Sequence, residues 1–116
     1  MLKINFMGHD IELVKSKYMD NERLAILMID DGYIIESLTV NIPECTLMSE
    51  YIGEGYEGFI NQIDGVSYDY TIDWLEENNL SDEIGLSRAT SGFNNYLSAF
   101  FNEDTLEQMR NLEEIK

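Results

Sequence analysis

The sequence is poor in the residues that build disulfide frameworks and metal sites. Its 116 residues include one cysteine, Cys45, and one histidine, His9. An internal disulfide and a cysteine-rich zinc site are therefore excluded, and a multi-histidine metal site has no second imidazole available. We expect neither residue to be catalytic, because His9 lies in a turn region and the acidic neighbours Glu44 and Glu50 disfavour a thiolate at Cys45.

Long apolar runs are also missing. The longest, from Leu24 to Ile29, spans six residues, whereas a membrane-spanning helix needs roughly 18. The first residues lack the apolar core of a signal peptide, and the acidic Asp10 follows soon after them. We therefore expect a cytoplasmic protein without a membrane segment.

Positive charge is scarce. Seven lysine and arginine residues stand against 23 aspartate and glutamate residues, so the formal net charge is −16. A contiguous basic surface for gripping phosphate groups can hardly be assembled from so few cations, and direct nucleic-acid binding is not expected. Residues 1–48 carry eight acidic and four basic side chains, whereas residues 49–116 carry 15 and three. The excess acid therefore lies mostly in the later part of the chain.

Apolar residues are nevertheless abundant enough to build a core. The chain is 44% hydrophobic and 11% aromatic, with one proline and eight glycines, a composition unlike that of disordered proteins. The length suits one domain, and no internal repeat or linker-like tract divides the sequence. We predict a single domain over residues 1–116.

The first residues predict a hairpin. Leu2, Ile4 and Phe6 alternate with polar residues, which is the period of a half-buried strand. Turn-forming residues follow at positions 8–10, and the apolar pattern resumes over residues 11–13.

A second hairpin is predicted directly afterwards. Residues 23–29 are apolar at almost every position, as in a central strand covered on both faces. Residues 30–32, Asp-Asp-Gly, favour a tight reversal, and alternation returns over residues 33–42. Pro43 ends the pairing because it has no N–H to donate.

The remainder predicts helices and one further strand. Residues 44–65 are predicted to form a loop with a short helical or extended piece. Residues 67–78 have the period of an amphipathic helix, and Asn79 is predicted to cap its C-terminal end. A strand is predicted over residues 93–101 and a last helix from Glu103 to about Ile115. The sequence thus predicts an α+β fold, in which an antiparallel sheet of about five strands carries one packed helix and a short C-terminal helix.

The predicted core follows from these periodicities. We expect the following side chains to be buried: Leu2, Ile4, Phe6, Ile11, Leu13, Leu24, Ile26, Met28, Leu38, Val40, Ile42, Ile72, Leu75, Leu97 and Phe101.

No catalytic or cofactor motif is present. Acidic residues at predicted strand ends lack the spaced ligand loop of a calcium site. Gly53, Gly55 and Gly58 resemble a phosphate-binding loop only superficially, because glutamates stand at 54 and 57 and no lysine follows. We expect no metal, no cofactor and no enzymatic activity.

Four segments together resemble a family of small acidic proteins that is known as a domain of unknown function. They are residues 18–26, 38–43 and 74–80, and the Ser-Gly-Phe of residues 91–93 with aromatic residues behind it. Leu-Thr-Val-Asn-Ile-Pro, residues 38–43, is the most specific segment. The resemblance covers roughly residues 2–101 and implies a setting on plasmids, conjugative elements and phages of low-GC Gram-positive bacteria. It implies no catalytic residue.

The strongest functional signal is the acidity of residues 50–83, which contain no lysine or arginine. Carboxylates around tyrosines favour a protein partner with a basic surface, for example the nucleic-acid channel of a host defence or DNA-handling protein. The candidate contact residues are Glu50, Glu54, Tyr56, Glu57, Asp69, Asp73, Glu76 and Glu77, and we expect their carboxylates to face water.

Two alternatives stay open. The acidic residues are equally compatible with a face that only keeps the protein soluble. A small ligand-binding domain or enzyme would instead have an aromatic-lined pocket, among Tyr51, Tyr56, Tyr68, Trp74 and Tyr96.

Overall fold

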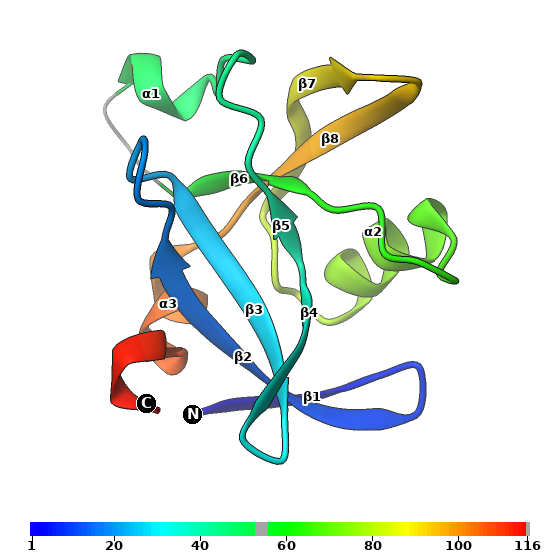
Figure 1. Cartoon of the computed structure of the whole chain (residues 1–116), viewed down its shortest axis with the longest axis vertical. Coiled ribbons are helices and arrows are strands. Elements are labelled where there is room, and N and C mark those ends of the chain that lie inside the picture. The colour runs from blue at the N-terminus through cyan, green and yellow to red at the C-terminus, as the bar shows by residue number, and fades with distance from the viewer. Residues whose placement is uncertain (53–55, 116) are drawn as a thin grey trace.

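The computed structural model describes residues 1–52 and 56–115, whose strands form two sheets with helices beside them (Figure 1). The first sheet contains, in spatial order, β1 (Leu2–Phe6), β2 (His9–Lys17), β3 (Leu24–Asp30) and β4 (Tyr33–Ser37), and β9 (Arg110–Asn111) also pairs with β2. The second sheet contains β5 (Thr39–Val40), β6 (Glu57–Ile60), β8 (Asn94–Phe100) and β7 (Glu83–Ser91) in that order. The helices are α1 (Ser49–Ile52), α2 (Tyr68–Glu77), α3 (Glu103–Gln108) and the 3₁₀ turn η1 (Leu112–Glu114). The predicted α+β fold is confirmed.

The N-terminal meander forms as predicted. Both hairpins turn through two residues of positive φ, Met7 and Gly8 in the first and Asp31 and Gly32 in the second. Such turns match the right-handed twist of the strands that they join. The first turn lies slightly earlier than predicted, since His9 already pairs with Phe6 in the ladder.

The chain passes from one sheet to the other at Leu38. Its N–H donates to the carbonyl of Ile26 in β3, and its own carbonyl accepts from the N–H of Asn61 beyond β6, both at 2.9 Å. The predicted strand over residues 33–42 is therefore divided into β4 and β5. Apolar alternation continues across the division because both sheets enclose buried side chains, so the sequence pattern does not reveal the change of partner.

The second sheet contains elements that the sequence pattern hides. β6 lies in the segment predicted as a loop with a short helical or extended piece, and all four of its residues are buried, so they show no alternation. β7 was not predicted. Its pairing with β8 is irregular between Ile84 and Arg88, where Gly85 has a φ of 82°. Such a bulge interrupts the two-residue period by which strands are recognised.

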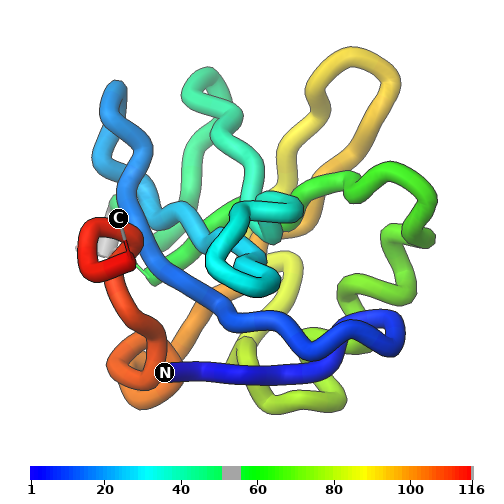
Figure 2. Tube along the Cα trace, turned by 60° about the horizontal axis from the view of Figure 1, so that its bottom comes forward, coloured from blue at the N-terminus to red at the C-terminus, as the bar shows by residue number. Residues whose placement is uncertain are grey.

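The last predicted helix is too long. α3 ends at Gln108, and Met109 is already extended with φ −86° and ψ 133°. The chain then forms β9, which pairs in parallel with β2 through Val14 and Arg110 (Figure 2). Strand pairing with a distant part of the chain therefore overrides local helix propensity.

The main core contains residues of the first sheet, of β6 and β8 in the second sheet, of α2, and of α3 with the following Met109. Most of the predicted core is buried, while Leu2, Ile4, Val40 and Leu97 are half-buried. Ile42 belongs to a second, smaller cluster with Leu47, Phe59 and Ala89. Over the described residues, no helix is long and apolar enough to cross a membrane.

Candidate functional site

The best-defined charged feature is one face of α2. Thr71, Ile72, Trp74 and Leu75 are buried, while all four acidic residues of the helix are exposed. These are Asp69, Asp73, Glu76 and Glu77, and we call them the α2 acidic stripe. Asp73, Glu76 and Glu77 follow Asp69 by four, seven and eight residues, and these spacings place all four side chains along one side of the helix.

This stripe works against the stability of its own helix. Asp69 and Asp73, and likewise Asp73 and Glu77, are like charges four residues apart, and each such pair costs about 0.2 to 0.5 kcal/mol. Glu76 and Glu77 also stand at the negative end of the helix dipole, and the last turn holds no basic residue. The local charge arrangement is thus unfavourable for the isolated helix.

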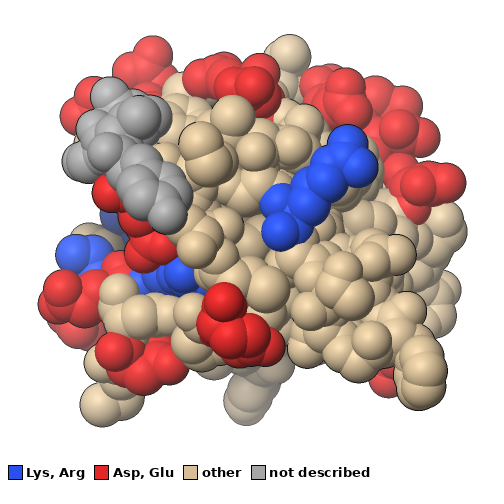
Figure 3. All heavy atoms as spheres, turned by 90° about the horizontal axis from the view of Figure 1, so that it is seen from above, with Lys and Arg blue, Asp and Glu red and all other residues tan. Residues whose placement is uncertain are grey.

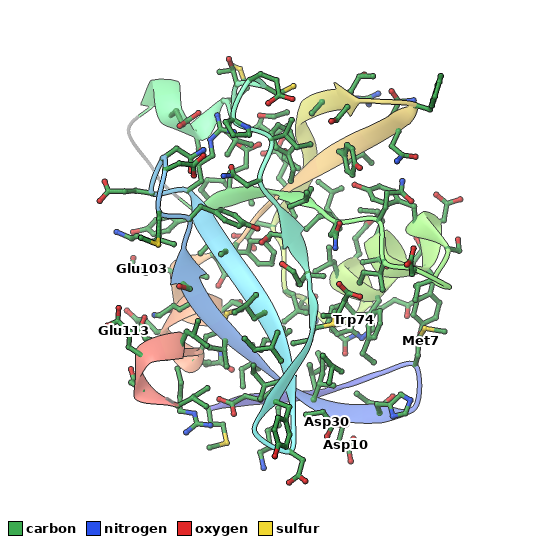
Figure 4. All side chains as sticks on the ribbon, viewed as in Figure 1. Met7, Asp10, Asp30, Trp74, Glu103 and Glu113 are labelled. Atoms are coloured by element: carbon green, nitrogen blue, oxygen red, sulfur yellow. The ribbon has the colours of Figure 1, made fainter. Side chains whose placement is uncertain are left out.

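Packing and capping hold α2 firmly in place. The indole N–H of Trp74 donates to the carbonyl of Asn5 in β1 at 2.8 Å, and its ring meets that of Phe6 edge-on, with centroids 4.8 Å apart (Figure 4). At the other end, Asn79 has a φ of 54°, and Leu80 donates its N–H back to the carbonyl of Leu75 at 3.0 Å. The predicted left-handed cap is confirmed, and the stripe stands on a fixed support.

Glu57 is not part of this surface, contrary to the prediction that it faces water. It is 1% exposed and accepts hydrogen bonds from the backbone N–H of Ser49, at 3.0 Å, and from the hydroxyl of Ser98. The hydroxyl of Ser98 in turn accepts the N–H of Ser87 in β7. Glu57 therefore connects α1 to the second sheet, which is a structural role.

Glu50 is also engaged within the fold. Its carboxylate pairs with the guanidinium of Arg23 at 2.9 Å. Partial burial opposes ionisation, but the hydrogen bonds from Arg23 and from the N–H of Leu47 prevail and lower the pKa of Glu50. Arg23 also donates to the carbonyls of Ile42 and Cys45, at 2.9 and 2.7 Å. Glu50 therefore anchors this turn and stands apart from the stripe, since α1 and α2 lie on different sides of the molecule (Figure 1).

Of the remaining predicted contact residues, Glu54 lies outside the described residues. Tyr56 is half-buried, its ring meets that of Phe100 edge-on at 6.1 Å, and it lines a groove of about 610 Å³ beside β2 and α3. Glu103 and Glu113 also line this groove (Figure 4).

Of the aromatic residues of the alternative hypothesis, Tyr68 and Tyr96 lie together, while Trp74 and Tyr56 pack against other rings. The hydroxyl of Tyr68 donates to the carbonyl of Ile60 and accepts the N–H of Leu97, both at 2.9 Å, and burial raises its pKa. Its ring meets that of Tyr96 edge-on at 6.5 Å, whereas Trp74 packs against Phe6. The side chain of Tyr51 is outside the described part of the chain. Across the residues that the structure describes, no three His, Cys, Asp or Glu side chains are arranged to hold a metal ion.

The charge distribution is uneven over the surface as well. Figure 3 shows the molecule from above relative to Figure 1, with aspartate and glutamate mostly towards the rim and lysine or arginine near the middle and at the left. Many of these carboxylates gather on the right of the view, which is the side of α2 in Figure 1.

Two segments of the family resemblance, residues 18–26 and 38–43, contact each other. The amide of Asn21 donates to the amide oxygen of Asn41, and the amide of Asn41 donates to Asp20, both at 2.9 Å. The hydroxyls of Tyr18 and Thr39 are also 2.9 Å apart. These contacts hold the turn after β2 against β5 and thereby fix the place where the chain changes sheets.

Residues 12–114 match the model of a family described as a domain of unknown function (DUF4313). The chain belongs to this family. The match includes both of these interlocking segments and the whole of α2. Comparison with curated proteins and with solved structures gave no match.

Proposed function

We propose that this domain is a non-enzymatic binding protein whose α2 acidic stripe docks on a basic surface of another protein. The observation that carries the proposal is the placement of Asp69, Asp73, Glu76 and Glu77 on one face of a firmly packed helix, at a cost to the helix itself. Solubility alone does not require this arrangement, because the chain has many other exposed acidic residues.

The kind of partner follows from the spacing of the charges. With a rise of 1.5 Å per residue, carboxylates four residues apart are separated by about 6 Å along the helix. Phosphates of one DNA strand are likewise closely spaced, at about 3.4 Å along the helix axis. A cationic groove that follows a nucleic-acid backbone therefore also attracts a row of carboxylates. The mobile-element setting implied by the family resemblance favours a host defence or DNA-handling protein as the owner of that groove.

The test compares two variants of equal net charge. In the first, the stripe is neutralised by Asp69→Asn, Asp73→Asn, Glu76→Gln and Glu77→Gln. The matched control neutralises four exposed acidic residues of α3 and η1 instead: Glu103→Gln, Asp104→Asn, Glu107→Gln and Glu113→Gln. Each variant, immobilised, is presented with host extract at several salt concentrations, and the retained proteins are identified.

We expect a protein that the parent chain and the control retain and that the stripe variant loses. Its binding weakens as salt rises, because exposed charges are screened over about 8 Å at physiological ionic strength, and duplex DNA competes for it. If the two variants retain the same proteins equally well, the stripe is only a solvated surface.

A second candidate function is small-molecule binding in the groove beside β2 and α3. Its volume of about 610 Å³ is in the range of ligand sites, and Leu24, Tyr56, Leu106 and Leu112 give it apolar walls. A screen of small organic cations by ligand-observed NMR, repeated with Tyr56→Ala, separates this function from protein binding.

A further inference from the structure

We propose that the free edge of β4 is a second interaction site, which binds an extended, lysine- or arginine-containing segment of a partner protein by adding it as a further strand of the first sheet. This inference goes beyond the α2 stripe, because it concerns another element and another mode of recognition.

β4 is an edge strand whose outer side is open. It pairs with β3 alone, and within residues 1–52 and 56–115 no backbone hydrogen bond joins Tyr33–Glu36 to any other segment. An unpaired strand edge presents N–H and C=O groups that an extended chain can satisfy. The open stretch ends at Ser37, whose carbonyl accepts from the amide of Asn61 and whose N–H bonds to the carboxylate of Glu36.

The side chains of this edge are unusual for a surface strand. Tyr33, Ile34 and Ile35 are 75%, 56% and 50% exposed. Ile35 is the extra residue of a bulge, because Ile34 pairs with Ile29 and Glu36 pairs with Met28. β1, at the opposite edge, instead exposes Lys3 and Asn5. Proteins usually protect an edge with lysine, proline or a bulge. β4 has such a bulge at Ile35 but no lysine or proline, and three of its apolar side chains are at least half exposed.

The charges around β4 identify the occupant. Asp30 and Asp31 stand at one end of the strand and Glu36 at the other. A groove of about 530 Å³ beside the turn is lined by Asp10, Asp30 and Asp31, and Figure 4 shows Asp10 close to Asp30. Lys3 and Arg110 also line this groove, but Arg110 is neutralised by Glu12. A strand with apolar residues in its middle and cations at its ends complements this edge.

A second copy of the chain is a poor occupant. Antiparallel pairing of two β4 strands would bring Asp31 of one copy towards Glu36 of the other, and both molecules carry a formal charge of −16. Like charges placed directly opposite each other destabilise a strand pair.

The probe is a synthetic nine-residue peptide in which five alternating valine and threonine residues are flanked by two lysines at each end. Its control has glutamate in place of every lysine. We expect saturable binding of the lysine peptide to the full chain, at least tenfold tighter than that of the control. We also expect hydrogen exchange of the Ile34 to Glu36 amides to slow at least tenfold when the peptide is bound.

Two sets of variants test the site itself. Ile34→Lys with Ile35→Lys should weaken binding at least tenfold, whereas Phe93→Lys, at a fully exposed apolar side chain away from β4, should not. Asp31→Asn with Glu36→Gln should weaken binding while keeping the turn, because asparagine tolerates the φ of 50° at residue 31. Circular dichroism confirms that each variant folds.

The proposal is overturned if the lysine peptide does not bind, if protection appears at β1 or α2 instead of β4, or if the parent chain forms a dimer that the Ile34 and Ile35 substitutions abolish. Neutralising the α2 stripe should leave the protection of β4 by the peptide in place. Failure at the edge is therefore distinguishable from failure of the proposed function.

Discussion

Phe6→Ala should destabilise the protein strongly, because this ring joins the first hairpin to α2. Phe6 is 7% exposed, and its ring meets those of Trp74 and Tyr70 edge-on at centroid distances of 4.8 and 5.8 Å. Truncating a buried phenylalanine to alanine costs about 3 to 5 kcal/mol through lost burial and the cavity that remains. The free energy of unfolding of small domains is only about 5 to 15 kcal/mol, so this substitution should remove a large part of it.

Urea denaturation measures this effect. Trp74 is the one tryptophan of the chain and reports local packing by fluorescence, while far-ultraviolet circular dichroism reports the whole fold. With a slope of about 2 kcal/mol per molar urea, the midpoint should fall by roughly 1.5 to 2.5 M. The control is Phe93→Ala, which removes the same ring from a fully exposed position, and should change stability by less than about 0.5 kcal/mol. Equal midpoints for the two variants would refute the packing of α2 on β1.

Three further predictions concern charge. The hydrogen bond and charge of Arg110 lower the pKa of Glu12 below its ordinary 4.5. The pair therefore stabilises the fold above pH 4.5, and this stabilisation is lost as the pH falls through the folded-state pKa. The difference in thermal stability between the parent chain and Glu12→Gln should accordingly shrink at acidic pH. Glu57→Ala should cost about 2 to 4 kcal/mol in urea unfolding by leaving two buried donors unpaired, while Glu57→Gln should cost less. Glu77→Lys should raise the free energy of unfolding, measured in urea, by about 0.5 to 1.5 kcal/mol, because it replaces a repulsion with Asp73 by an attraction and suits the helix dipole.

The features that could be predicted from the sequence are those set by neighbouring residues. The two hairpins follow from alternation and from turn residues of positive φ, and α2 follows from its period of 3.6 and its cap at Asn79. The α2 stripe was predictable for the same reason, since helical geometry alone places residues 69, 73, 76 and 77 together.

The features that could not be predicted depend on distant contacts. Glu57 looks like a solvent-exposed acid in a glycine-rich segment, and only its hydrogen bonds to Ser49 and Ser98 make its burial tolerable. The end of α3 is decided by pairing with β2, which no local pattern signals. The open edge of β4 likewise becomes visible only when the strand order is known.

The pairing of β9 with β2 also affects how the protein is made. Val14 is fully buried and pairs with Arg110, and Arg110 also supplies the cation for the buried carboxylate of Glu12. Ribosomes add about 5 to 20 residues per second, so roughly 5 to 20 s pass between the synthesis of β2 and that of β9. During that interval the nascent first sheet lacks its partner along one edge of β2 and carries an uncompensated charge. The newborn chain therefore keeps this unpaired edge and this buried acidic group without their partners until residue 110 has been made.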